Sequence, residues 1–284
     1  MENTESRVWF ITGCSTGFGR ELAKAVLTRG ERVVATARKV EEVQDFEESG
    51  PELARAVRLD VTDPEEVSGA VDAALDAFGR IDVLVNNAGY GSMGGVEEIS
   101  DEEIRRQFEV NVFGVLNITR AVLPHMRERR QGHIINISSV GGFVGVPGFG
   151  IYNGTKFAVE GISEALALET EPLGIHITIV EPGAFRTDWA GRSLAPPPAI
   201  DDYRETVGQT REYISNENGN QQGNPRLAAE AMISAVEADE PPLRLPLGDD
   251  ALGMIREKLD SVKRETDTWE TTIVETSFEH GATE

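Results

Sequence analysis

Short apolar runs recur along the chain, and between them apolar residues return at helical spacing. The runs are Val8–Ile11, Arg32–Ala37, Ala56–Leu59, Val83–Val85, Ile134–Ile137, His176–Val180 and Leu243–Leu247. Runs of this length without polar alternation indicate strands that are buried on both faces, as in parallel sheets. The alternation predicts an α/β fold: one domain over residues 1–284, with a doubly wound, seven-stranded, mostly parallel sheet of order 3-2-1-4-5-6-7 flanked by helices.

The helical stretches have recognisable ends. They cover Glu21–Arg29, the stretch from Asp63 to Gly79, Ser100–Arg127, Tyr152–Glu169 and Asn224–Ala238. Asp63 before Pro64 is typical of an N-cap followed by a first-turn proline. Ser100 and Glu103 form a capping box, so we expect one long helix from Ser100 to about Arg127.

The pattern breaks down after residue 187. Residues 188–223 contain three consecutive prolines and a polar run, and they predict an irregular loop. A loop of this length inside a compact domain is usually a lid or a disordered segment. Residues 249–284 form a charged tail with helical spacing over Asp249–Trp269, and we expect its end from Glu275 to be frayed.

Composition narrows the classes of function. The 284 residues carry 49 acidic against 27 basic side chains, a formal net charge of −22, and only 5 of the bases are lysines. Such a charge disfavours binding to nucleic acid or to anionic membranes. The acidic, lysine-poor composition resembles proteins adapted to high salt, and it equally suits an ordinary acidic enzyme from a GC-rich genome.

Cysteine content and hydropathy indicate the compartment. Cys14 is the only cysteine, so no intrachain disulfide can form, and a reducing compartment fits. No apolar run approaches the ~18–20 residues of a membrane span, and the first residues are polar, unlike a signal peptide. We therefore expect a soluble, cytoplasmic protein without a membrane partner.

Three side chains that can do chemistry lie between Ile134 and Ile162: Ser139, Tyr152 and Lys156. Tyr152 and Lys156 are four residues apart on a predicted helix, so they project from one face. The free phenol titrates near pH ~10, and acid–base work at pH ~7 requires a pKa shift of about 3 units, or roughly 4 kcal/mol. A neighbouring ammonium can supply about 1–3 units. With Ser139 at a strand end opposite the phenol, the gap between them suits a carbonyl or carbinol oxygen.

A glycine cluster joins the first apolar run to the first helix. The segment Thr12–Gly19 has the spacing G-x-x-x-G-x-G. Between a strand and a helix, such glycines suit a pyrophosphate: Gly13 allows the turn, Gly17 the close approach of backbone, and Gly19 the packing of helix on strand, while helix N–H groups face the anion. The alternative is a plain turn.

The end of the second run indicates which dinucleotide would bind. In NAD sites an acidic residue about 20 residues past the glycines binds the ribose 2′-hydroxyl, whereas an arginine accommodates a 2′-phosphate. Arg38 and Lys39 occupy that place, and no acid appears before Glu41. These cations predict a phosphate site, with Arg38 stacking or forking onto the phosphate and Ser15 donating from the turn. Otherwise Arg38 is a solvated loop residue.

Together these features resemble the short-chain dehydrogenase/reductase family in its compact single-domain form. The matching elements are the Ser139–Tyr152–Lys156 spacing, the glycine turn preceded by Thr12, the tetrapeptide Asn86-Asn87-Ala88-Gly89, and Pro182-Gly183 followed by Thr187. The likeness covers roughly Val8 to Thr187, and the C-terminal part looks like hydroxysteroid or retinol dehydrogenases. The resemblance implies a Rossmann-type fold and hydride transfer between a nicotinamide dinucleotide and a carbonyl or secondary alcohol. Arg38 and Lys39 indicate that NADP(H) is preferred over NAD(H).

The resemblance also implies which residues act, without a metal. The catalytic residues would be Asn111, Ser139, Tyr152 and Lys156. The cofactor would contact Gly13, Ser15, Thr16, Gly17, Phe18, Gly19, Arg38, Asp60, Val61, Asn87, Ala88, Gly89, Tyr152, Lys156, Pro182, Gly183 and Thr187.

Some of these roles have structural alternatives. In the family, the asparagine at the Asn111 position distorts the helix, so that the carbonyl of this residue binds a water molecule on the proton path to solvent. The alternative is that the buried Asn111 side chain simply hydrogen-bonds neighbouring backbone. Asp60 would bind the adenine amino group, or it could cap a turn. Trp189 and Tyr203 are either walls of a substrate pocket or contacts that pack the 188–223 lid down.

The resemblance implies a small-molecule substrate, an apolar carbonyl compound or alcohol. The C-terminal likeness to hydroxysteroid and retinol dehydrogenases indicates that the apolar group of this substrate is bulky. It also implies a homodimer or homotetramer that pairs through the two long helices at the sheet edge. The same fold could serve two other functions: a sensor or scaffold that binds NADP(H) without turnover, and an epimerase or dehydratase. The joint presence of four catalytic residues disfavours the sensor. The lack of an obvious basic cluster for a sugar diphosphate disfavours the epimerase.

Overall fold

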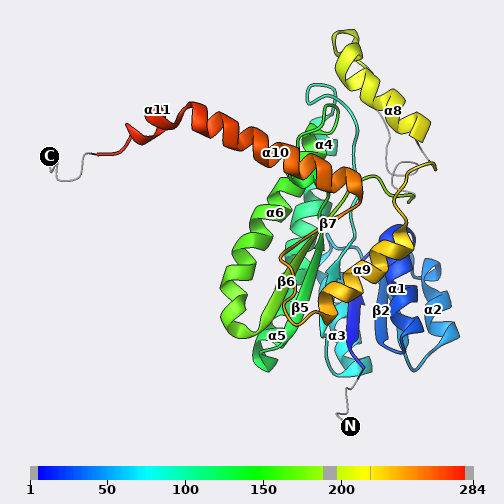
Figure 1. The fold of residues 1–284 in the computed structure, drawn as a ribbon. Helices are drawn as coiled ribbons and strands as arrows, with labels where there is room; N and C mark the ends of the chain where they lie inside the picture. The colour runs from blue at the N-terminus through cyan, green and yellow to red at the C-terminus, as the bar shows by residue number, and fades with distance from the viewer. Residues whose placement is uncertain (1–5, 188–196, 218, 279–284) are drawn as a thin grey trace.

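The computed structural model describes residues 6–187, 197–217 and 219–278. Its centre is a seven-stranded sheet in which every neighbouring pair is parallel, in the order β3-β2-β1-β4-β5-β6-β7 (Figure 1). The strands are β1 (Val8–Ile11), β2 (Arg32–Ala37), β3 (Ala54–Arg58), β4 (Val83–Asn86), β5 (Gly132–Ile137), β6 (Ile175–Pro182) and β7 (Arg244–Leu247). The predicted Rossmann-type fold and strand order are therefore confirmed.

Helices cover both faces of the sheet (Figure 1). They are α1 (Gly17–Thr28), α2 (Gln44–Ser49), α3 (Pro64–Phe78), α4 (Asp101–Phe108), α5 (Gly114–Arg129), α6 (Gly150–Thr170), α8 (Gln209–Glu217), α9 (Pro225–Glu237), α10 (Asp249–Thr268) and α11 (Glu270–Val274). Alternate residues of a strand point to opposite faces. In β1, Trp9 and Ile11 therefore belong to the core under α1 and α9, whereas Phe10 belongs to the core under α3 and α5.

Element boundaries differ modestly from the predictions. Helix α1 begins at Gly17 rather than Glu21, because the last glycines of the turn already form its first helical turn. Asp63 caps α3 by accepting hydrogen bonds from the backbone N–H groups of Glu65 and Glu66, as its position before Pro64 predicts. Short 3-10 turns, which were not predicted, lie at Val40–Glu42, Val140–Gly142, Glu171–Leu173 and Asp201–Tyr203.

The predicted helix from Ser100 to Arg127 is interrupted. Ser100 caps α4 as expected, but a π-helical turn, η2 (Glu109–Phe113), separates α4 from α5. Asn111 lies inside this turn, and its side-chain amide bonds both backbone groups of Tyr90 in another loop. We attribute the extra residue of the turn to this tertiary anchor, which helical periodicity in the sequence does not reveal.

The lid is more regular than predicted. Among its described residues, a second π turn, η6 (Arg204–Gly208), leads into α8. Helix α8 has no buried residues, so it carries no apolar stripe for a periodicity search to find. A buried ion pair anchors it: the Glu98 side chain is 1% exposed and accepts a 2.7 Å hydrogen bond from Arg211.

The chain ends in a projecting helix. Helix α10 begins beside β7, runs past α6 and leaves the body of the molecule, with α11 beyond it (Figure 1). Among the described residues, no helix is both long enough and apolar enough to cross a membrane.

Candidate active site

Several of the sequence-predicted site residues follow the carboxyl ends of neighbouring parallel strands. The glycine turn follows β1, Asn87–Gly89 follows β4, Ser139 lies two residues past β5, and Pro182 ends β6. The carboxyl ends of parallel strands lie at one edge of a sheet, which is where doubly wound folds bind their ligands. The topology therefore brings these distant segments to one edge.

The glycine turn has the backbone that its spacing predicts. Gly13 and Gly17 have φ angles of +71° and +60°, in the left-handed region that favours glycine. A Cβ at Gly19 would lie 2.5 Å from both the Gly13 carbonyl oxygen and the Asn87 Nδ2 atom. Thr16 makes no side-chain cap at the start of α1, so the first N–H groups of this helix are available to an anion.

Thr12 fastens the glycine turn to the loop after β4. Its hydroxyl donates to the carbonyl of Val85 and accepts 2.9 Å hydrogen bonds from the N–H groups of Asn87 and Ala88. The Asn87 amide in turn donates to the carbonyls of Thr12 and Gly13, at 2.8 and 2.9 Å. These bonds set the spacing between the two loops before any ligand arrives.

Three further cofactor candidates, Phe18, Thr187 and Gly183, lie close to these loops. The ring of Phe18 packs edge-on against the ring of Phe185, with centroids 5.1 Å apart. A Cβ on Gly17 would lie 3.6 Å from the Thr187 Cβ, so the loop after β6 reaches the glycine turn. Gly183 has no room for a side chain, because the Asp250 carboxylate occupies that space and accepts a hydrogen bond from the Ala184 N–H.

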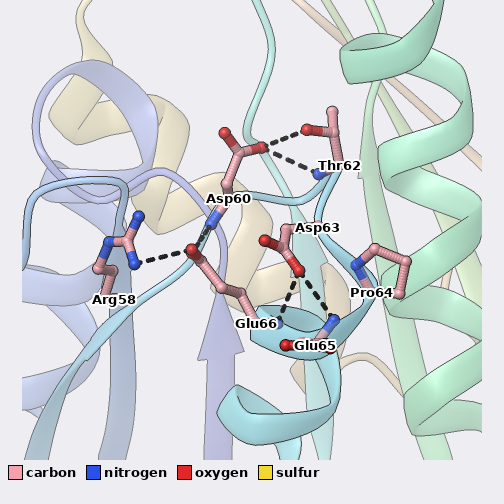
Figure 2. Close-up of a pocket in the computed structure, with 7 residues that line it drawn as sticks. All are labelled: Arg58, Asp60, Thr62, Asp63, Pro64, Glu65 and Glu66. Atoms are coloured by element: carbon pink, nitrogen blue, oxygen red, sulfur yellow. Dashed lines mark hydrogen bonds and ion pairs between the residues drawn. The ribbon is translucent and has the colours of Figure 1, made fainter.

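A depression beside β3 contains Asp60 (Figure 2). One Asp60 oxygen accepts hydrogen bonds from the N–H and hydroxyl of Thr62, at 3.0 and 2.7 Å. Burial opposes ionisation here, but these bonds and the charges of Arg38 and Arg58 outweigh it and lower the pKa of Asp60. One oxygen of Asp60 thus caps a turn, as in the alternative to the predicted adenine contact. The other oxygen takes no part in this cap.

Arg38 and Val61 flank this depression differently. Arg38 is exposed after β2, and within the described part of the chain its side chain takes no hydrogen bond or ion pair. Arg58, by contrast, is paired with Glu66 at 2.8 Å. Val61 is buried, and a Cβ on Gly114 at the start of α5 would lie 2.5 Å from it.

Ser139, Tyr152 and Lys156 come together between β5 and α6. The side chains of Ser139 and Tyr152 share a hydrogen bond, and the Ser139 oxygen also accepts one from the Gly141 N–H at 3.0 Å. The Lys156 ammonium donates to the Ile137 carbonyl at 2.8 Å and lies 5.8 Å from the centroid of the Tyr152 ring. Two hydroxyls and an ammonium are thus gathered at one strand end.

The pKa of Tyr152 moves opposite to the expected direction. Burial raises the pKa of Tyr152 to about 12, although the Ser139 hydrogen bond opposes the rise. Burial likewise lowers the pKa of Lys156 to about 8, although the nearby Glu160 carboxylate opposes the fall. Desolvation disfavours the charged form of both groups, and in the unliganded protein it outweighs the mutual stabilisation that the sequence suggested.

Asn111 connects this cluster to the loop after β4. Its side-chain oxygen accepts from the Tyr90 N–H at 3.1 Å, and its amide donates to the Tyr90 carbonyl and the Thr155 hydroxyl, at 2.8 and 3.1 Å. A Cβ on Gly89 would lie 3.1 Å from the Asn111 oxygen and 3.8 Å from the Lys156 nitrogen. Asn111 therefore lies in a π turn that interrupts its helix, its side chain bonds the backbone of another loop, and it lies next to Lys156.

Sequence reasoning missed a partly buried charge cluster near Lys156. Arg244 on β7 donates to Glu160 and Glu164 of α6 and to Glu181 of β6. Glu181 is fully buried, and burial together with the Glu160 charge raises its pKa to about 7. A usable signal was present: Glu160 lies one helical turn past Lys156, and Glu181 interrupts an apolar strand just before Pro182.

The other side of Tyr152 is apolar. Met93, Phe149 and Tyr152 form a small buried cluster, against which Val146 and Ile214 of α8 pack. Tyr203 does not belong to it: its hydroxyl donates to Glu97 at 2.7 Å, which fits the lid-packing alternative. Trp189 lies outside the described residues.

Known proteins with similar sequences are oxidoreductases. The family model described as short chain dehydrogenase matches residues 7–196. An oxidoreductase of Botryotinia fuckeliana is 40% identical, over 93% of this chain and 97% of its own length. A 3-ketodihydrosphingosine reductase of Bacteroides thetaiotaomicron is 39% identical, over 86% and 88%. A human retinol dehydrogenase is 34% identical, over 84% and 80%.

Solved structures of the same family share the fold. The crystal structure of a short-chain dehydrogenase from Streptomyces avermitilis has 42% sequence identity and a TM-score of 0.91, covering 97% of this chain and all of that one. A Burkholderia phymatum relative in complex with NAD has 25% identity and a TM-score of 0.81, over 93% and 97%. A Burkholderia cenocepacia relative in complex with NADP has 28% identity and a TM-score of 0.72, over 93% and 97%. By sequence and by fold, this chain belongs to the short-chain dehydrogenase/reductase family of oxidoreductases.

Proposed function

We propose that this chain is an NADP(H)-dependent oxidoreductase that moves hydride between nicotinamide and a carbonyl or secondary alcohol carbon. The observation that carries the proposal is the hydrogen-bonded pair of Ser139 and Tyr152 beside the ammonium of Lys156. Two adjacent hydroxyls suit one carbonyl oxygen, which would accept a hydrogen bond from each. The glycine turn at the same edge of the sheet supplies the anion site that a dinucleotide needs.

The protein's part in the reaction follows from these groups. The bound nicotinamide supplies or accepts the hydride. In the reducing direction, Ser139 orients the carbonyl oxygen and Tyr152 donates a proton to it. The Lys156 ammonium stabilises the phenolate that remains and would bind the nicotinamide ribose, and Asn111 supports the proton path beside it. A phenol pKa near 12 without ligands keeps Tyr152 protonated, which is the form a proton donor requires.

The proposed cofactor contacts follow the loops at the sheet edge. They are Gly13, Ser15, Thr16, Gly17, Phe18, Gly19, Arg38, Asp60, Val61, Asn87, Ala88, Gly89, Tyr152, Lys156, Pro182, Gly183 and Thr187. Arg38 supports NADP(H) over NAD(H), because it is a cation near the ribose end of the site with no internal carboxylate bound to it among the described residues. One relative was crystallised with NAD and another with NADP, so the preference of this chain is tested by comparing its KM values for NADPH and NADH.

The substrate we propose is a small apolar ketone, aldehyde or alcohol. The apolar side chains of Met93, Phe149 and Ile214 around Tyr152 support it. The relatives named 3-ketodihydrosphingosine reductase and retinol dehydrogenase support an apolar group on the substrate. The 188–223 segment would act as the lid, and exposed Phe113, Phe157 and Leu168 would let subunits pair through the η2–α5 and α6 helices.

The test is NADPH consumption over a panel of apolar ketones and aldehydes. We expect Tyr152→Phe to lower kcat by at least about 100-fold, the low end for general acid–base catalysis, while NADPH binding stays within about twofold of wild type. Tyr213→Phe, on the exposed face of α8, is the matched control and should leave kcat unchanged. NADPH binding without turnover of any panel member would favour the sensor instead, and full activity of Tyr152→Phe would remove the assignment.

A further inference from the structure

The helix α10 is packed against the body only at its beginning. Ala251 and Ile255 are buried there, and every described residue from Arg256 to Phe278 is exposed. Figure 1 shows α10 and α11 projecting beyond α6, without a neighbouring element along most of their length. An isolated helix of this length is marginally stable in water, so a surface that covers it would stabilise it.

The projecting segment formed by α10 and α11 carries an apolar seam. Apolar residues return along it at alternating intervals of three and four positions, broken only at Thr266. They are Leu252, Ile255, Leu259, Val262, Trp269 and Ile273. The intervals are those of the a and d positions of a coiled coil, which form a stripe that packs against a second helix. Beyond the body this stripe is open: the exposed fractions are 54% at Leu259, 41% at Val262, 59% at Trp269 and 50% at Ile273.

Charge along α10 and α11 is divided into two halves. Residues 256–264 contain four basic and two acidic side chains, whereas residues 265–275 contain four acidic side chains and no basic one. Two of the five lysines of this acidic chain, Lys258 and Lys263, lie in the basic half. Two copies side by side in the same direction would place like charges together, and two copies in opposite directions would place the basic half of each beside the acidic half of the other.

We propose that the α10–α11 seam is a self-association surface, on which the same segment of a second copy of this chain packs antiparallel. Centring the pair near Arg264 places Leu259 of one copy opposite Trp269 of the other and sets the two charge halves against each other. The acidic half argues against an anionic membrane as the occupant, because it would face the lipid phosphates. This surface is separate from the cofactor and substrate residues.

Engineered disulfides test both the contact and its direction. The only native cysteine, Cys14, is buried, so a cysteine introduced on α10 is the reactive one. Ten residues of helix span about 15 Å, and a disulfide requires Cα atoms about 4.4–6.8 Å apart, so positions 259 and 269 cannot bond within one helix. We expect Leu259→Cys/Trp269→Cys to give a covalent dimer on mild oxidation, and either single variant to remain uncrosslinked. Crosslinking of a single variant alone, or failure of the double variant to crosslink, would overturn the antiparallel pairing.

A second measurement isolates the apolar seam. The double variant Leu259→Asn/Trp269→Asn should have a dissociation constant for self-association at least tenfold higher than that of wild type, as measured by sedimentation equilibrium. Ser261→Asn/Thr268→Asn, which changes exposed positions off the seam, should leave it within twofold. Equal effects of the two double Asn variants would also refute the proposal. If the wild-type protein binds phosphatidylcholine–phosphatidylglycerol vesicles and the cysteine double variant does not crosslink, the seam is a lipid-binding surface instead. NADPH binding should match wild type in all variants, so either result is independent of the proposed function.

Discussion

The ammonium of Lys156 is held 2.8 Å from the carbonyl oxygen of Ile137, the last residue of β5. This bond ties the first turns of α6 to the strand that leads into Ser139. Tyr152 lies one helical turn before Lys156 and is therefore carried to the Ser139 hydroxyl. The geometry of the proposed site thus depends on how α6 is docked on β5.

Glu160 should set the pH range of the proposed reaction. Burial lowers the pKa of Lys156 to about 8 and the Glu160 carboxylate opposes that fall, so the ammonium is lost as pH rises through about 8. We expect kcat for carbonyl reduction to decline above that pH. Glu160→Gln removes the opposing charge and should move the midpoint of the decline to lower pH.

The matched control for this pH profile is Glu164→Gln. Glu164 also pairs with Arg244, but its side chain is 50% exposed and it is not among the groups that shift Lys156. A midpoint that moves equally in both variants would mean that the Arg244 cluster, rather than the Glu160 charge, controls the decline.

Gly19→Ala should disrupt the glycine turn. The new Cβ would lie 2.5 Å from the Gly13 carbonyl oxygen and from the Asn87 amide nitrogen. These two atoms are hydrogen-bonded to each other, and the Asn87 amide also bonds the Thr12 carbonyl, so displacing the amide would break these bonds. We expect unfolding free energy to fall by about 1–3 kcal/mol, the usual cost of overpacking, and NADPH affinity to fall as well. Gly69→Ala on α3 has nothing within 4 Å of its Cβ and should instead gain about 0.5–1 kcal/mol. Denaturant titration with and without NADPH measures both, and an unperturbed Gly19→Ala would contradict the packing.

Arg38→Gln should separate the two cofactors. If Arg38 holds the 2′-phosphate, its loss should raise the KM for NADPH about tenfold, equivalent to about 1.4 kcal/mol, and leave the KM for NADH unchanged. Lys24→Gln makes the same charge change on the outer face of α1, where Lys24 pairs with Glu21, and should alter neither value. Unchanged KM values for both cofactors would mean that Arg38 is a solvated loop residue, and an equal rise in both would mean that Arg38 does not distinguish the 2′-phosphate.

Glu181 should make stability depend on pH. Burial and the Glu160 charge raise its folded-state pKa to about 7, well above the ordinary glutamate value of 4.5. Between these values the folded state binds more protons than the unfolded state, so the Glu181 contribution is present at low pH and is lost as pH rises toward 7. Glu181→Gln keeps a hydrogen-bond acceptor for Arg244 but does not titrate. The stability difference, wild type minus Glu181→Gln, should therefore decrease from pH 4.5 to pH 7 in urea titrations; a constant difference would contradict the assignment.

Glu98 should anchor the lid. Its buried carboxylate accepts 2.7 Å hydrogen bonds from Arg211 and from the N–H groups of Gly95 and Ile200. Glu98→Ala leaves these donors without their partner, and we expect it to lower unfolding free energy by about 1–3 kcal/mol and to raise the KM for substrate. NADPH affinity should not change. Glu97→Ala, which removes only an exposed contact to Tyr203, should leave the substrate KM near wild type.

Several local features could be predicted from the sequence because each depends only on residues close together in the chain. The apolar runs, the cap at Asp63, the glycine turn and the four-residue step from Tyr152 to Lys156 each depend on neighbouring residues. The strand order also followed, since alternating strands and helices admit few right-handed arrangements. The polar helix α8 was missed because its anchor, Glu98, lies far away in sequence.

The sequence by itself determined the layered fold, the place of the glycine turn and the identity of the hydroxyls and the amine at the candidate site. Only the tertiary structure decided how those groups are charged and what surrounds them. Burial raises the pKa of Tyr152 and lowers that of Lys156. Arg244 on β7 pairs with Glu160 on α6 and Glu181 on β6, so these three side chains come from three different elements. Desolvation and ion pairing depend on distances in space between residues far apart along the chain, and no pattern of neighbouring residues encodes those distances.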